Sequence, residues 1–90
     1  MSREDVIRRG ESAQHLLNNP TALAALDAIE ESCKNAWAAS APENTVMRDD
    51  AYQMMRCIRL LRTQLTIWRD DATAEIKIFE QRQRDAHMMN

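Results

Sequence analysis

The stretch that decides the fold runs from Met47 to Arg69 and reads MRDDAYQMMRCIRLLRTQLTIWR. Apolar residues recur along it at alternating steps of four and three, a spacing that places them on one face of a helix. This face, called the seam below, consists of Met47, Ala51, Met54, Ile58, Leu61, Leu65, Trp68 and Ala72. The seam predicts one long amphipathic helix, and we expect the preceding chain to cover it.

The composition also indicates an all-α protein. The chain has 90 residues with a single glycine and two prolines, and its commonest residues are good helix formers. A net charge of -2 and a pI near 5.6 argue against a general nucleic-acid binder. No apolar run is long enough to span a membrane, and the first ten residues lack the apolar region of a signal peptide. We therefore expect neither a membrane span nor export.

Turn and capping residues divide the chain into helices. We expect a single domain over residues 1–90, with a three-helix fold made of a helical hairpin, an N-terminal helix and one long C-terminal helix. Ser2, Asn19-Pro20 and Asn44 suit helix starts. The helices are expected at about 2–18, 20–39, 45–69 and 72–84.

The gap between the last two ranges rests on Asp70-Asp71. Adjacent acids are unfavourable near the negative C-terminal end of a helix but suit the start of a new one. The apolar pattern also changes phase there, which is typical of a local change in supercoil. The long helix is therefore expected either to continue through Asp70-Asp71 or to kink near it.

Gly10 lies on the apolar face of the first expected helix, with Val6, Ala13 and Leu17. A glycine inside a helix costs up to about 1 kcal/mol relative to alanine. Either this cost is tolerated without a reason in the packing, or a partner backbone approaches so closely that a side chain has no room.

Charges differ between the second helix and the long helix. The second helix is acidic, and the long one carries Arg56, Arg59, Arg62 and Arg69. A short connection makes the two helices antiparallel, which places Glu30 near Arg56 and Asp27 near Arg59. These arginines therefore either pair with the second helix or form a face for an anionic partner.

The long helix has a second apolar face, opposite the seam, made of Leu60, Ile67, Ala74 and Ile78. A helix that is apolar on two sides needs cover on two sides. We expect this face to be a protein interface, in a homo-oligomer or against a larger assembly. The alternative is that the first two helices straddle the long one and cover both sides.

The sequence contains no recognisable catalytic, cofactor or metal constellation. His15 and His87 have no second ligand at helical spacing apart from Glu11, one turn before His15. Cys33 and Cys57 have apolar neighbours and are expected to be buried, free thiols in a reducing compartment. We expect a protein that is not an enzyme and that holds no cofactor or metal.

A resemblance adds a biological setting. The chain resembles a group of small, uncharacterised helical proteins of tailed bacteriophages, encoded near head and portal genes. The residues that carry it are Arg9-Gly10-Glu11, Ala13, Leu16-Leu17, Asn19-Pro20, Ala25-Leu26, Ile29-Glu30, Trp37, Arg48, Leu61 and Leu65. Members often carry a glycine after the long helix, where this chain has Asp70-Asp71-Ala72.

The resemblance implies a non-enzymatic phage structural or assembly protein, located in the host cytoplasm during assembly or in the virion. Its partners would be other phage structural proteins or further copies of itself. Two alternatives stay open on the sequence: a helical inhibitor or regulator of a host protein, and a DNA-packaging accessory that uses the arginine-rich face. Nucleic acid is the less favoured partner, and no membrane is expected.

Overall fold

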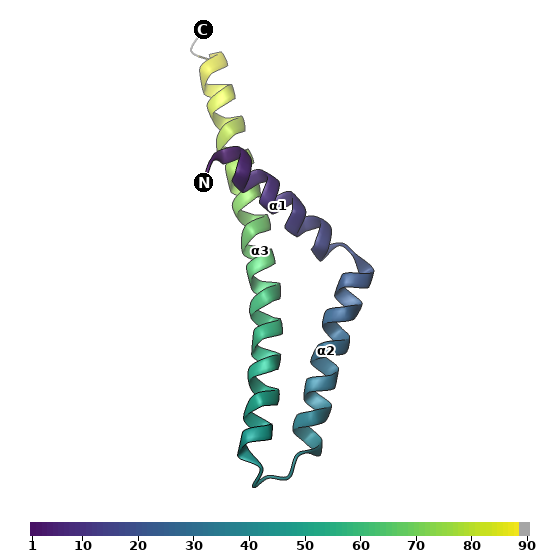
Figure 1. Ribbon diagram of the computed structural model, residues 1–90. Helices are drawn as coiled ribbons and strands as arrows, with labels where there is room; N and C mark the ends of the chain where they lie inside the picture. The colour runs from purple at the N-terminus through teal and green to yellow at the C-terminus, as the bar shows by residue number, and fades with distance from the viewer. Residues whose placement is uncertain (89–90) are drawn as a thin grey trace.

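The computed structural model describes residues 1–88 and confirms the all-α prediction. It contains α1 (Arg3–Leu17), α2 (Pro20–Ala39) and α3 (Thr45–Met88). α1 and α2 follow one another along the same side of α3, antiparallel to it, and bend where they meet (Figure 1). They contact α3 far more than each other. The fold is therefore a helical hairpin whose first arm is broken into two helices.

The helix starts follow the predicted capping chemistry. The Ser2 hydroxyl accepts a hydrogen bond from the Asp5 amide at 3.2 Å. The Asn19 side chain accepts from two amides of the first turn of α2, at 2.9 and 3.0 Å. Asn44 accepts from the Met47 amide at 3.2 Å. Each cap satisfies backbone donors that have no partner within the helix, so each fixes where its helix begins.

Of the two possibilities for the long helix, the structure has the continuous one, and the predicted boundary between 69 and 72 is wrong. No glycine or proline lies in the 44 residues of α3, so nothing in the backbone ends it. Both acids also find cations: Asp70 accepts from Arg69 Nε at 3.1 Å, and Asp71 lies 3.8 Å from Arg9 Nη2. These contacts offset the cost of adjacent carboxylates inside a helix.

The seam is buried along one line only. Its members at seven-residue spacing, Ala51, Ile58, Leu65 and Ala72, are between 4% and 9% exposed. Met47, Met54 and Leu61 alternate with them and are half exposed, at 46%, 52% and 46%. The expectation that the preceding chain covers the whole seam is therefore wrong. One helix packed on another shields a single row of side chains, and here no third helix lies beside the pair among the described residues.

α1 crosses α3 at Gly10, which is buried against Ala72. A Cβ added at Gly10 would overlap the Ala72 side chain and lie 2.6 Å from the Trp68 carbonyl oxygen. Arg9 and Arg3 flank the crossing, with their guanidinium groups over the rings of Trp68 and Phe79 at 4.8 and 5.1 Å. The close-approach interpretation of Gly10 is therefore confirmed, and the backbone that approaches is that of α3.

The molecule is far from compact. It measures 72 × 24 × 18 Å, with a radius of gyration of 19.8 Å where a compact chain of this length has about 12 Å. Its accessible surface is 6782 Å², whereas a compact monomer of 10.4 kDa exposes about 5,400 Å². The chain therefore exposes about 1,400 Å² more surface than its mass requires.

Candidate functional site

The α2–α3 hairpin has one edge closed by charges. Arg62 of α3 donates from Nη2 to Asp27 Oδ1 at 2.7 Å and from Nε to Glu30 Oε1 at 3.2 Å. Near the turn, the Arg48 guanidinium lies over the Trp37 ring at 4.0 Å and donates to the Ser40 carbonyl at 3.3 Å. These contacts fix the turn and the separation of the two helices.

The predicted pairing of Glu30 with Arg56 and of Asp27 with Arg59 is wrong, because Arg62 binds both acids. A helical side chain leans toward the N-terminus of its own helix. Arg62 therefore reaches acids that lie beside an earlier turn of α3. Arg56 and Arg59 are exposed and make no ion pair within residues 1–88. The arginine row is thus split, because Arg62 and Arg69 are in ion pairs.

The opposite edge of the hairpin is an open groove with little charge. One hollow, with a volume of about 310 Å³, lies between α2 and α3 near the turn. It is lined by Ser32, Cys33, Ala36, Met47, Asp50, Ala51 and Met54. A second hollow of about 300 Å³ lies toward the bend, where Leu16, Leu17, Ala22, Leu23, Ala25, Leu26, Leu61 and Leu65 line it. Asp50 is the one charged residue in either lining.

The two helices contribute side chains of different size to this edge. α2 presents Ala25, Ser32 and Ala36, whereas α3 presents Met47, Met54 and Leu61. We call these six residues the apolar groove. Ile29 lies between Ala25 and Ser32 at helical spacing and is 43% exposed, so one large side chain interrupts the small residues of α2. The residues of α3 are large throughout, and together the two rows form an exposed apolar surface along the hairpin.

The interface predicted from the sequence lies on a different face. Leu60, Ile67 and Ile78 are exposed, between 44% and 57%, and Ala74 is exposed as well. The alternative in which α1 and α2 straddle α3 is wrong, because the buried residues of α3 recur every seven positions along one side. Whether a partner covers this second face stays a prediction.

The sequence pattern missed the apolar groove because it assigned Met47, Met54 and Leu61 to the core. A signal for the groove was present in α2, where the uncharged residues Ala25, Ile29, Ser32 and Ala36 share one edge and acids lie on the other. Such a helix predicts one charged rim and one uncharged rim. Cys57 was also expected to be buried, and it is exposed.

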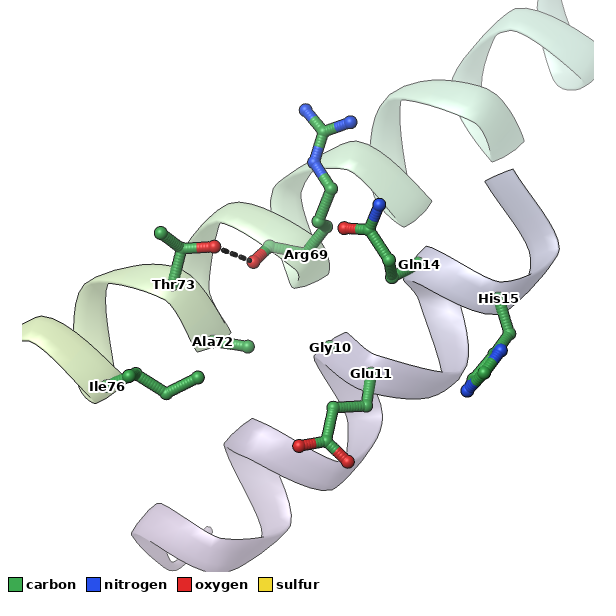
Figure 2. Close-up of a pocket in the computed structure, with 8 residues that line it drawn as sticks. All are labelled: Gly10, Glu11, Gln14, His15, Arg69, Ala72, Thr73 and Ile76. Atoms are coloured by element: carbon green, nitrogen blue, oxygen red, sulfur yellow. Dashed lines mark hydrogen bonds between the residues drawn. The ribbon is translucent and has the colours of Figure 1, made fainter. Parts of the chain in front are cut away.

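A third hollow, of about 230 Å³, lies where α1 crosses α3. Figure 2 shows Gln14 directed toward Arg69, while Glu11 and His15 point away from that arginine. Thr73 donates to the Arg69 carbonyl at 3.1 Å, so its hydroxyl is used within the helix. The lining brings together no nucleophile with a base, and we assign this hollow no chemistry.

Residues 1–88 contain neither a metal-binding cluster nor a membrane-spanning helix. No group of three or more histidine, cysteine, aspartate or glutamate side chains is placed to hold a metal ion. No helix has a stretch that is long and apolar enough to cross a membrane.

Comparison of the chain with models of protein families, with curated proteins and with solved structures found no match.

Proposed function

We propose that this chain is a small, non-enzymatic phage assembly or structural protein that works through helix-mediated contacts with other proteins. The observation that carries the proposal is the apolar groove, whose Met47, Met54 and Leu61 are half exposed. The phage setting rests on the resemblance described above. The groove supports the mode of action, since it offers a helix-sized apolar surface with a charged rim on one side.

Burial of these side chains would supply useful binding energy. Taking a Met or Leu side chain fully out of water is worth about 1.5–3 kcal/mol, and about half of that remains available on the three groove residues. The gain competes with the loss of freedom on association. The groove therefore needs a partner that covers its whole length. The groove runs along α3, so a partner helix laid alongside α3 does this most directly.

Photo-crosslinking in phage-producing cells tests the proposal. A photoreactive amino acid replaces Met54 in the groove in one strain and Leu60 on the opposite face in a control strain, two positions with similar exposure of 52% and 57%. We expect crosslinks to phage head or portal proteins, identified by mass spectrometry, whereas a crosslink to a further copy of the chain alone would count against the assembly role. Crosslinks to a host protein alone would favour the regulator, and an absence of protein crosslinks at both positions would refute the proposal.

A further inference from the structure

We infer that a second copy of this chain occupies the apolar groove, so that two α2–α3 hairpins pack face to face as a four-helix bundle. This inference deepens the proposed function and rests on it for the role of the dimer. It follows from three properties of the described residues: the surface left exposed, the residues of the groove, and the distribution of charge around α3.

The excess of exposed surface is larger than the area that each partner of a stable dimer buries. The excess over a compact monomer of this mass is about 1,400 Å², and a standard protein–protein interface buries about 800 Å² of each partner. α2 is also poorly covered, because none of its residues between Pro20 and Ala39 is buried in the described chain. A hairpin whose shorter arm has no buried residue is half of a bundle, since the core forms when a second layer is added.

A two-fold axis parallel to the helices brings the apolar grooves of two copies together. It places Met47, Met54 and Leu61 of one copy over the α2 edge of the other copy. This edge consists of the small residues Ala25, Ser32 and Ala36 and of Ile29, whose exposed side chain adds apolar surface to the contact. The same contact repeats in the opposite sense, as an isologous interface requires. Each α3 is then antiparallel to the α2 beneath it, so all neighbouring helices in the bundle are antiparallel.

Charge favours this face over the other exposed face of α3. Leu60 and Ile67 are flanked by Arg56 and by Asp70-Asp71, which would have to be desolvated or paired in a contact. In the apolar groove the one charged lining residue is Asp50, at the edge near the turn. Covering the groove therefore removes apolar surface from water with little desolvation of charge, which is the condition for a net gain.

Sedimentation velocity of the full chain over a series of concentrations tests the dimer. We expect the native chain to sediment as twice its mass of 10.4 kDa. Met54→Lys places a charge in the centre of the contact twice per dimer, and we expect it to raise the dissociation constant at least about 100-fold. Leu60→Lys is the matched control, because Leu60 on the other side of α3 has a similar exposure, 57% against 52% for Met54, and it is expected to leave the dimer intact.

Ser32→Arg is a second groove variant that keeps the test decisive if Met54→Lys fails to fold. Ser32 is exposed and lines the hollow near the turn, so a long charged replacement fills the groove without replacing a buried residue. A monomeric native chain overturns the inference. Dissociation by Leu60→Lys with retention of the dimer in both groove variants also overturns it, and assigns the dimer to the opposite face.

Cysteine pairing tests the arrangement. In chains carrying Cys33→Ala and Cys57→Ser, a Ser32→Cys variant and a Met54→Cys variant are mixed and oxidised. We expect the mixed disulfide to exceed either homodimeric disulfide several-fold, because the inferred two-fold axis places Met54 of one copy over the α2 edge that carries Ser32 in the other. Predominance of either homodimeric disulfide contradicts this arrangement.

The two proposals fail separately. If the native chain is monomeric but Met54 crosslinks to a phage structural protein in cells, the function stands and the second copy is wrong. If the chain is dimeric through the groove but no phage protein is captured at any exposed position, the dimer stands and the assembly role is wrong.

Discussion

Replacing Gly10 with alanine gives the sharpest test of how α1 is held on α3, because two physical effects predict opposite signs. In a helix that faced only solvent, Gly→Ala would stabilise by about 0.8–1 kcal/mol through backbone propensity. At Gly10 the new Cβ would overlap the Ala72 side chain and lie 2.6 Å from the Trp68 carbonyl oxygen. Both obstacles belong to the helix itself rather than to the end of a flexible side chain, so α1 as a whole must move outward.

Forcing one extra carbon into a packed contact costs typically about 1–3 kcal/mol. Moving α1 outward also loosens the stacking of Arg9 on Trp68, now at 4.8 Å, and of Arg3 on Phe79. These losses outweigh the gain in propensity, and we expect a net destabilisation of about 1–2 kcal/mol. For a domain of this size that lowers the melting temperature by roughly 4–16 °C.

The assay is thermal unfolding followed by circular dichroism, at one fixed protein concentration because association shifts apparent stability. Hydrogen exchange adds a local measurement, in which amides of α1 should lose protection before those of α3 between 51 and 65. Ser12→Ala is the matched control, since Ser12 is exposed on α1 and gains propensity without a clash. A melting temperature that rises for Gly10→Ala as it does for Ser12→Ala would refute the close-packing argument.

Three other predictions concern the hairpin and the long helix. Leu65→Ala, at a residue 8% exposed, should lower the free energy of unfolding by about 2–5 kcal/mol. Leu60→Ala should change the free energy of unfolding of the monomer by less than about 0.5 kcal/mol. Equal effects of the two mutations in denaturant titrations would mean that the seam is not the core. Arg62→Ala should cost about 1 kcal/mol more than Arg59→Ala, because Arg62 pairs with two acids, and the difference should shrink in 1 M salt if screening is the cause. Ala72→Pro should break α3 and release α1 by removing a helix hydrogen bond, at about 3 kcal/mol or more; unchanged helicity would contradict a continuous α3.

The sequence predicted the elements well because helix formation here depends on local chemistry. Ser2, Asn19 and Asn44 cap the helices, and these roles follow from residue type and position alone. For Gly10 the sequence left two explanations open, a tolerated glycine or the close approach of another backbone. The position of Ala72 in the structure decides for the second. The candidate site was harder to predict, because a pattern of apolar residues on one helix does not say how many other helices cover that face.

The misassigned groove shows why patterning predicts an amphipathic face better than it predicts burial. Met47 and Met54 stand at the same heptad spacing as Ala51 and Ile58, yet the first two are half exposed and the others buried. The difference depends on the number of covering helices. α1 and α2 lie end to end along α3 rather than beside one another, and the last turns of α3 extend beyond α1 (Figure 1), so no cross-section of the described residues contains more than two helices. Two helices bury one row each, whereas a heptad seam has two rows and is complete when a further helix covers the second. The uncovered row is therefore the part of the seam that a further helix would cover, and in the dimer inferred above that helix comes from the second copy.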